Sequence, residues 1–278
     1  MKKITAPIIA TIITSLFLMP LPSFAAAPPW QVMKEKLQYP KVGAHQGYIW
    51  GFYHNTMMAF ERAKSEGADI VELDLRASRD GVAVVYHDET LEDWTKCKGK
   101  VSDHTLAELK NCSFYNNQEQ IPTFAEVLEW AQGQIIINAE FKDQASIAPA
   151  LNDLKKYQAH NWVYFQTQQS KQKYELARYL DAEVVLLYVL RNQEDLDWFL
   201  GRNDPALLIA ELNNDSRYPD WIQKLHAAGK LTSEDSFNHS KLKELFGATC
   251  TDVFNFGIDI AITNRTESCV EQAQKYLY

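Results

Sequence analysis

The feature of this sequence that most constrains its fold is a regular alternation of short apolar runs with amphipathic stretches. The runs rich in Val, Ile and Leu predict buried strands, and the stretches between them carry apolar residues at helical spacing. The predicted strands are residues 41–46, 69–76, 82–87, 135–141, 163–167, 183–190, 206–212, 230–233 and 258–264. The predicted helices are Asn55 to Ser65, Thr123 to Ala131, Ile147 to Tyr157, Lys171 to Leu180, Glu194 to Leu200, Pro219 to Ala228 and Lys241 to Phe246. Strands that alternate with helices are typical of βα units around a parallel sheet.

The number of predicted strands favours a closed barrel with one irregularity. A TIM barrel uses eight parallel strands, so one of the predicted strands is additional. Ser78-Arg79-Asp80-Gly81 joins the second and third of them and is too short to hold a crossover helix, so this connection is a tight turn. The region after the third strand contains no barrel strand and one short helical stretch near Thr105 to Lys110. We therefore expect an α/β fold, a distorted TIM (β/α)8 barrel with a small disulfide-bearing insertion at about 89–121.

The start of the chain is typical of an exported protein. Two lysines precede an apolar run that is interrupted by prolines and is too short for a membrane span, and Ser23-Phe24-Ala25 has the small residues of a cleavage site. We expect residues 1–25 to be a signal peptide, residues 26–278 to form a single domain, and the protein to be periplasmic or secreted. An uncleaved membrane anchor is the alternative. No later stretch is apolar enough to cross a bilayer, so no stable membrane insertion is expected.

The charge of the chain excludes one class of partner. It carries 28 basic and 36 acidic side chains, a formal net charge of −8. Nucleic acid and anionic membrane surfaces repel such a chain. We therefore expect no nucleic-acid partner. The substrate is expected to be a small molecule and the protein a monomer, although the charge does not bear on the oligomeric state.

The four cysteines are predicted to form disulfides because an exported chain meets an oxidising compartment. Cys97, Cys112, Cys250 and Cys269 allow three pairings. The preferred pairing is Cys97 with Cys112 and Cys250 with Cys269, which closes two short loops. Closing a loop of about 15 residues stabilises by roughly 3 kcal/mol on the loop-entropy account. Neither pair has the close C-x-x-C spacing that structural zinc usually needs.

Carboxylates stand at the ends of two predicted strands, where active sites of barrels are built. The second predicted strand contains Glu72 and Asp74, and the fourth contains Glu140 followed by Lys142. Residues two apart on a strand point to the same side, so these side chains are expected to converge. A solvated strand face is the alternative for a lone E-x-D pattern. Carboxylates that converge favour the binding of one Ca²⁺ or Mg²⁺ ion by Glu72, Asp74 and Glu140. Lys142 beside them would supply a fixed positive charge to a phosphate oxygen.

Two histidines also end apolar strands, His45 on the first predicted strand and His87 on the third. Taken alone, either is as readily explained as a hydrogen-bonded structural group. Together they suit cleavage of a phosphodiester, because one imidazole can take a proton from the attacking hydroxyl and the other can give one to the leaving alkoxide. A metal beside them would offset charge on the phosphate oxygens.

These residues belong to a series of short motifs that follow one another along the chain. They are His45-Gln46-Gly47, His54-Asn55-Thr56 with Ala59-Phe60, Gly67-Ala68-Asp69, Glu72-Leu73-Asp74, Asp80-Gly81, His87-Asp88, Ile121-Pro122-Thr123 and Glu140-Phe141-Lys142. No single motif is specific, but their order over residues 41–142 resembles the glycerophosphodiester phosphodiesterase family. The resemblance implies a distorted TIM barrel, the three metal ligands already named, and His45 and His87 as general base and general acid. We assign the base to His45, although the sequence itself does not separate the two roles.

The resemblance also implies a reaction, the hydrolysis of glycerophosphodiesters to an alcohol and glycerol 3-phosphate. The sequence departs from the family pattern at Gln46, where the family has Arg, at His54, where it has Glu, and at Asn264-Arg265-Thr266, where it has Asp-x-Pro. Gln46, His54 and Lys142 are predicted to bind the substrate. Two alternatives stay open: lysophospholipase D or sphingomyelinase D-like activity, and a non-catalytic phosphate- or lipid-binding protein.

Aromatic residues complete the sequence features that bear on the substrate. The loop from Tyr48 to Tyr53 is unusually aromatic and either accepts an acyl chain or packs under the insertion. Trp94 lies near a helical pattern, and we predict that it packs in the interior of the protein rather than against the substrate.

Overall fold

The computed structural model describes residues 26–277 apart from 116–118, 213–218 and 239–247. The predicted signal peptide at residues 1–25 and the predicted helix Lys241 to Phe246 lie outside the described residues. Among the residues that are described, no helix combines the length and the apolar character that crossing a bilayer requires.

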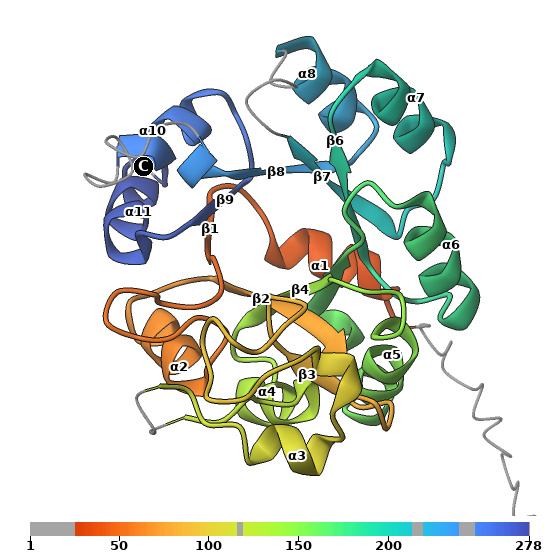
Figure 1. Ribbon diagram of the computed structural model, residues 1–278. Coiled ribbons are helices and arrows are strands. Elements are labelled where there is room, and N and C mark those ends of the chain that lie inside the picture. The colour runs from red at the N-terminus through yellow and green to blue at the C-terminus, as the bar shows by residue number, and fades with distance from the viewer. Residues whose placement is uncertain (1–25, 116–118, 213–218, 239–247, 278) are drawn as a thin grey trace, which may run out of the picture.

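Nine strands form one sheet that closes on itself (Figure 1). They are β1 (Lys41–Ala44), β2 (Ile70–Ala77), β3 (Ala83–Val85), β4 (Ile136–Phe141), β5 (Val163–Gln166), β6 (Leu186–Leu190), β7 (Leu207–Leu212), β8 (Leu231–Asp235) and β9 (Ile260–Thr263). Their order is β1-β9-β8-β7-β6-β5-β4-β2-β3, and an additional pairing between β1 and β2 closes the ring. The pairs within the ring are parallel, so the predicted TIM barrel is confirmed, and each predicted strand corresponds to an observed one.

The additional strand is β3, which lies outside the ring. It pairs with β2 in the antiparallel sense, with Val84 opposite Arg76. The chain reverses between them in a turn in which Gly81 N donates to Ser78 O at 3.0 Å. A two-stranded hairpin forms here because the turn is too short for the helix that a parallel connection needs. The irregularity that the sequence predicted at this place is therefore confirmed.

Helices surround the barrel (Figure 1). They are α1 (Pro29–Lys36), α2 (Met57–Ser65), α3 (Leu106–Lys110), α4 (Phe124–Ala131), α5 (Ile147–Lys156), α6 (Lys171–Leu180), α7 (Gln193–Gly201), α8 (Pro219–Ala227), α10 (Ala248–Asn255) and α11 (Thr266–Ala273). Three of them, α1, α10 and α11, were not predicted. In α1 the reason is clear, because the helix is short and Met33 is its one buried residue.

The barrel interior is apolar at one end and polar at the other. Met33 and Leu37, from α1 and the residue that ends it, pack with Ile70, Ile136 and other strand residues that point inward. Toward the carboxyl ends of the strands the inward positions become polar. The interior core therefore closes one end of the barrel and leaves polar groups at the end where barrel enzymes carry their sites.

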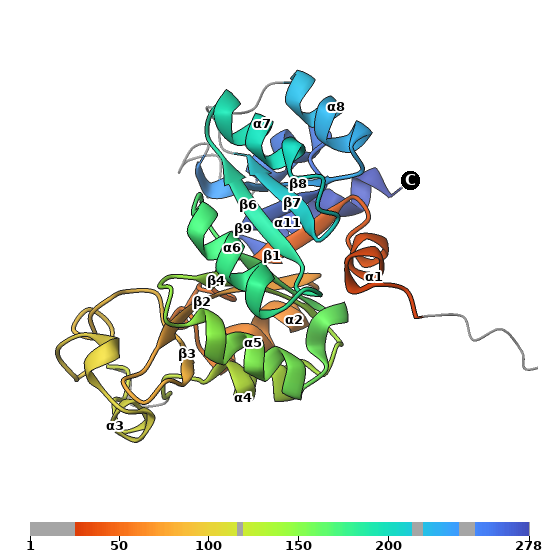
Figure 2. The same cartoon turned by 90° about the vertical axis from the view of Figure 1, so that its right-hand side faces the viewer.

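The predicted insertion is a small unit with its own core, and it stands out to one side of the barrel in Figure 2. Its buried residues include Val84, Tyr86, Leu91, Val101, Leu109, Phe114 and Ile121. The disulfide between Cys97 and Cys112 ties it together, with 5.6 Å between the Cα atoms. A second disulfide joins Cys250 to Cys269 and so α10 to α11. Both predicted pairings are confirmed.

Candidate active site at the carboxyl end of the barrel

Three carboxylates converge at the carboxyl end of the barrel. Glu72 and Asp74 lie two residues apart on β2, and Glu140 of β4 is the register partner of Asp74. One oxygen of each carboxylate lies within 4.8 Å of the other two, and all three residues are buried. In the part of the chain that the structure describes, no other group of three His, Cys, Asp or Glu side chains has this spacing. The structure thus brings together the three predicted metal ligands.

This cluster is suited to a cation because it concentrates negative charge in a buried place. Burial, together with the charges of Asp74 and Glu140, raises the pKa of Glu72 well above its usual range. The backbone N–H of Gln46 acts in the opposite direction, since it donates a 2.8 Å hydrogen bond to Glu72. A set of oxygen ligands alone suits a hard divalent ion. The residues present therefore fit the Ca²⁺ or Mg²⁺ ion that the sequence predicted.

Lys142 lies against the same carboxylates. Its Nζ is 2.8 Å from Glu140 Oε1 and 3.5 Å from Asp74 Oδ1. Burial lowers the pKa of Lys142, but the charges of Asp74 and Glu140 outweigh burial, so that the pKa is raised. The ammonium group therefore offsets part of the negative charge of the cluster. Its contact with a phosphate oxygen stays a prediction.

His45 follows β1 directly, and its imidazole is held in place by the residues that end and follow β9. Its backbone N–H donates to Thr263 O at 3.0 Å, and its Nδ1 lies 2.8 Å from Asn264 Oδ1. Because an amide oxygen accepts a hydrogen bond, Nδ1 is the donor and, in the neutral imidazole, Nε2 keeps its lone pair. The ring of Phe237 packs on the imidazole with 4.4 Å between centroids. The arrangement leaves Nε2 of His45 able to accept a proton.

His87 lies at the start of the insertion and is oriented by a carboxylate. Its Nδ1 is 2.7 Å from Asp88 Oδ1, while the other oxygen of Asp88 accepts a 2.8 Å hydrogen bond from Trp94 Nε1. Burial acts to raise the pKa of Asp88, but the hydrogen bonds from His87 and Trp94 outweigh it and the pKa is lowered. Asp88 is therefore ionised at neutral pH. Asp88 therefore places a negative charge beside the imidazole of His87 and fixes the orientation of the ring.

The turn after His45 is built to support a metal ligand. Gln46 and Asn55 both have positive φ angles, 55° and 56°, and both side-chain amides donate to Asp74 Oδ2, at 2.7 and 2.8 Å. Gly47 follows with φ 84°, and a Cβ there would lie 2.9 Å from the carbonyl carbon of Ala59. Such strained backbone is typical of functional sites. Gln46 thus holds a predicted metal ligand, and its contact with substrate stays a prediction.

A cavity of about 310 Å³ joins the two histidines. It is lined by His45, Gln46, His54, Asn55, Tyr86, His87, Asp88, Trp94 and Phe114. His54 packs on the ring of Trp94 at 4.9 Å between centroids. Burial and the charges of the two other histidines lower the pKa of His54, so this side chain is neutral near pH 7. One wall of the cavity is therefore imidazole and amide, and the other is the aromatic side of the insertion.

The aromatic residues of the loop after His45 make two different sets of contacts. Tyr53 packs against Phe114 and Trp94 of the insertion, with ring centroids 5.1 and 6.3 Å apart. Trp50 remains 45% exposed, its Nε1 donates to Asn264 O at 2.7 Å, and the Arg265 guanidinium lies 3.6 Å from the centre of its ring. The loop therefore both supports the insertion and stabilises the segment that holds His45.

Four residues of the site were not predicted to have a part in it. Asn55 and Asp88 lie within the motifs, and Asn264 is one of the departures from the family pattern, so each had a signal in the sequence. Trp94 packs against the core of the insertion, as predicted, but its ring also lines the cavity and its indole N–H reaches Asp88. That Trp94 does not contact the substrate stays a prediction. Its place beside the cavity was missed because the insertion has no regular pattern that shows where its side chains point.

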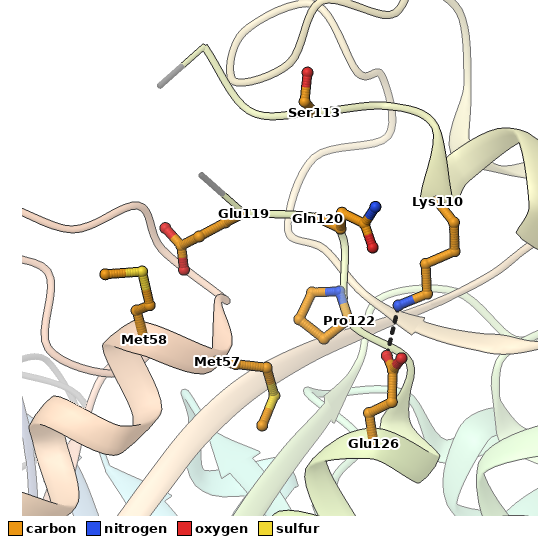
Figure 3. Close-up of a pocket in the computed structure, with 8 residues that line it drawn as sticks. All are labelled: Met57, Met58, Lys110, Ser113, Glu119, Gln120, Pro122 and Glu126. Atoms are coloured by element: carbon orange, nitrogen blue, oxygen red, sulfur yellow. Dashed lines mark hydrogen bonds and ion pairs between the residues drawn. The ribbon is translucent and has the colours of Figure 1, made fainter. Parts of the chain in front are cut away.

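A larger cavity, of about 450 Å³, lies elsewhere (Figure 3). It is bounded by Met57 and Met58 at the start of α2 and by the Lys110–Glu126 ion pair of 2.6 Å between α3 and α4. Neither catalytic candidate histidine nor any residue of the carboxylate cluster lines it. Size alone does not make this cavity the candidate active site, because His45 and His87 line the smaller one.

The comparison with known families agrees with this geometry. The family model described as the Glycerophosphoryl diester phosphodiesterase family matches residues 43–184, about half of the chain. The chain belongs to this family. The matched region contains all three histidines of the cavity and all three carboxylates of the cluster. The family resemblance seen in the sequence is thus confirmed.

Individual relatives support the same assignment. A glycerophosphodiester phosphodiesterase of Bacillus altitudinis is 38% identical over 130 residues, which are 44% of this chain and 53% of that protein. One of Bacillus subtilis is 33% identical over 139 residues, 44% and 46% of the two chains. The chain spans about half the length of the curated relatives it matches.

Solved structures show the same fold over nearly the whole chain. A glycerophosphoryl diester phosphodiesterase of Parabacteroides distasonis has a TM-score of 0.76 at 21% identity, with 89% of this chain and 91% of that one covered. A phosphodiesterase of Oleispira antarctica, solved in complex with the product sn-glycerol-3-phosphate, has a TM-score of 0.70 at 21% identity, with 85% and 97% covered. The barrel is therefore shared well beyond the region matched by sequence.

Proposed function

We propose that this protein hydrolyses glycerophosphodiesters to an alcohol and glycerol 3-phosphate, with a divalent cation and two histidines. The observation that carries the proposal is that His45 and His87 line one cavity beside a buried cluster of three carboxylates. Membership of the family and the reactions named for its relatives support the same reaction. The product named for the relative from Oleispira antarctica is the product expected here.

The hydrogen bonds of the two histidines support the assignment of roles that the sequence left open. His45 is held through Nδ1 by the neutral amide of Asn264, so its Nε2 acts as the base that takes the proton from the attacking hydroxyl. His87 is held by the carboxylate of Asp88, which stabilises a proton on the ring until it passes to the leaving oxygen. As the new P–O bond forms, the attacking hydroxyl gives its proton to Nε2 of His45. The P–O bond to the leaving alcohol breaks at the same time, and His87 gives a proton to the alcohol oxygen.

Glu72, Asp74 and Glu140 would hold the cation, and Gln46 and Asn55 keep Asp74 in place. When bound, such an ion supplies positive charge for the non-bridging phosphate oxygens. Lys142, His54 and Gln46 are the proposed contacts of the substrate. Of the three, only Lys142 carries a positive charge, because Gln46 is an amide and His54 is neutral near pH 7. A weaker hold on the phosphate is therefore expected than from a bidentate Arg at the position of Gln46.

The test of this proposal uses purified chain without residues 1–25 and two substrates, glycerophosphocholine and lysophosphatidylcholine, each with and without a chelator. Release of glycerol 3-phosphate that the chelator abolishes is the expected result. Release of lysophosphatidic acid or its cyclic form would instead place the protein with lysophospholipase D. No turnover of either substrate, with binding retained, would show a non-catalytic relative.

The histidine roles are tested by His45→Ala and His87→Ala, with His104→Ala on the insertion as the matched control. Both site variants should lose turnover while their circular dichroism stays that of the wild type, and the control should keep its activity. Wild-type rates in either site variant would refute the assigned role. Export from the cytoplasm and the monomeric state remain proposals from the sequence, which cell fractionation and light scattering test.

A further inference from the structure

Arg76 is a third ionisable side chain on the face of β2 that carries Glu72 and Asp74. Side chains alternate along a strand, so residues 72, 74 and 76 leave β2 on the same side. Arg76 lies just beyond the last register pair of β2 with β4, which is Leu75 with Phe141. Its side chain is only 14% accessible, and a guanidinium keeps its charge at any pH that the protein meets. A charge that is so little exposed needs polar partners.

The main partner of this guanidinium is the backbone carbonyl of His87. Nε and Nη2 of Arg76 donate to His87 O at 2.9 and 2.8 Å. The remaining nitrogen, Nη1, lies 3.8 Å from Asp143 Oδ2 in the segment between β4 and α5. Asp143 is fixed in turn, because its Oδ1 accepts a 2.8 Å hydrogen bond from the backbone N–H of Ser146. The guanidinium is therefore held on one side and binds the carbonyl of His87 on the other.

His87 depends on a side chain for this contact because it lies beyond the ladder between β2 and β3. That ladder ends at Val85 of β3. The next residue, Tyr86, is still held by β2, since its N–H donates to Asp74 O at 2.9 Å. At His87 the chain leaves the sheet for the insertion, and Arg76 takes the place of a neighbouring strand. A backbone carbonyl at such a position needs a donor.

The contact fixes where the proposed acid lies relative to the carboxylate cluster. One strand, β2, carries Glu72 and Asp74 and also binds the backbone of His87 through Arg76. The hydrogen bond to Asp88 orients the imidazole ring, whereas the Arg76 contact holds the backbone from which the ring projects. A general acid must lie within hydrogen-bond reach of the leaving oxygen. An error of about 1 Å in such a position can cost about 100-fold in rate.

A direct contact with the substrate is the alternative role for Arg76, since it also lines a cavity of about 450 Å³ together with Lys142 and Asp143. The existing contacts argue against that role. Bidentate binding of a phosphate uses two neighbouring N–H groups of a guanidinium. Nε and Nη2, one such pair, already bind the carbonyl of His87, and Nη1 of the other pair lies beside Asp143. The guanidinium therefore serves the backbone of His87.

We propose that Arg76 is a positioning residue for His87, which it ties through the backbone to the strand of Glu72 and Asp74. The proposal rests on the proposed function, because it requires His87 to give a proton to the leaving alcohol. Loss of Arg76 leaves the carboxylate cluster and His45 in place but lets His87 move with the insertion. The defect then falls on the step in which the P–O bond to the alcohol breaks.

The test compares two esters of glycerol 3-phosphate that differ in the leaving group. Choline leaves glycerophosphocholine as an alkoxide that needs a proton, whereas p-nitrophenol leaves as a phenolate that is stable without one. Arg76→Met should therefore lower kcat for glycerophosphocholine about tenfold, since it removes hydrogen bonds from a charged donor. The kcat for the p-nitrophenyl ester and both KM values should stay near those of the wild type. His87→Ala should show the same difference between the two esters, in a larger size.

Arg79→Met is the matched control. Arg79 lies in the same hairpin and also reaches the insertion, where its guanidinium donates to Asp103 O at 2.7 Å and to Glu108 Oε2 at 3.0 Å. These contacts do not involve His87, so the control should hydrolyse both esters at wild-type rates. Arg76→Lys keeps the charge but not the paired N–H groups, and it should recover part of the kcat lost with glycerophosphocholine. This variant gives an independent answer if circular dichroism shows that Arg76→Met does not fold.

The outcomes separate this proposal from the proposed function. Equal losses with both esters in Arg76→Met would overturn the positioning role, because a general defect of the fold lowers both rates. A raised KM at unchanged kcat would overturn it in favour of a direct contact with the substrate. Either result, with hydrolysis of both esters by the wild type, leaves the proposed function intact. Equal losses with both esters in His87→Ala, or a wild type that hydrolyses neither ester, would refute the proposed acid or the proposed function and the role of Arg76 with it.

Discussion

The pair formed by Asp88 and His87 offers a quantitative test of how the proposed acid works. Asp88→Asn keeps an oxygen that can accept from His87 Nδ1, where the wild-type distance is 2.7 Å. It removes the negative charge, and it also turns an amide N–H₂ toward Trp94 Nε1, which donates to the second carboxylate oxygen at 2.8 Å. The substitution therefore replaces the charged hydrogen bond to His87 with a neutral one. It also places two donors, the Asn amide and the indole N–H of Trp94, against each other.

The size of the effect follows from the change in hydrogen-bond type. A hydrogen bond to a charged group contributes about 1.5–3 kcal/mol, against about 0.5–1.5 kcal/mol for a neutral one. Asp88 is partly exposed, its side chain 28% accessible, so solvent reduces the difference and about 1 kcal/mol is expected. A loss of that size lowers kcat about fivefold. The defect should lie in kcat rather than KM, because a proton on His87 is needed as the leaving group departs.

The assay couples release of glycerol 3-phosphate from glycerophosphocholine to a dehydrogenase and compares Asp88→Asn, Trp94→Phe and the double variant. Trp94→Phe removes the opposed donor, so the double variant should be less impaired than the two single effects combined. Additive losses, or a kcat within twofold of wild type in Asp88→Asn, would refute the idea that the carboxylate acts through His87. A change in KM alone would do the same.

Three further outcomes are expected. Asn264→Ala removes a neutral hydrogen bond to His45, the proposed base, worth about 1 kcal/mol, and should lower kcat about fivefold with the melting temperature retained; an unchanged kcat would refute the positioning role. Replacing Cys97 and Cys112 together by Ser opens a loop with a separation of 15 residues and should cost about 3 kcal/mol in urea unfolding; no loss of stability would count against the loop-entropy account. A hydrogen bond to Asp259 raises the pKa of His226 against the effect of burial, so its stabilisation is fully present below about pH 6.5 and is lost as pH rises through the folded-state value. His226→Gln should therefore lose more stability at pH 6 than at pH 9, by less than about 1 kcal/mol, and equal losses at both would contradict it.

The sequence by itself determined the barrel and the chemistry of its mouth. The alternation of apolar runs and amphipathic stretches fixed the strand positions, because a parallel strand must be apolar on both faces and a helix on one. A turn of four residues after β2 excluded a crossover, which identified the additional strand. Glu72 and Asp74 were recognisable because two carboxylates on the same side of an apolar strand, matched by Glu140 and Lys142 on a second strand, repel one another unless a cation lies between them.

Only the tertiary structure decided which partners those residues have. Asn264 is more than 200 residues from His45 in sequence, and closing of the barrel through β9 beside β1 brings them to 2.8 Å. Trp94 reaches the cavity because the insertion folds back over it, and no periodicity of its sequence encodes that direction. Local pattern fixes which side of a strand a residue faces, whereas the closing of the ring fixes what it meets there.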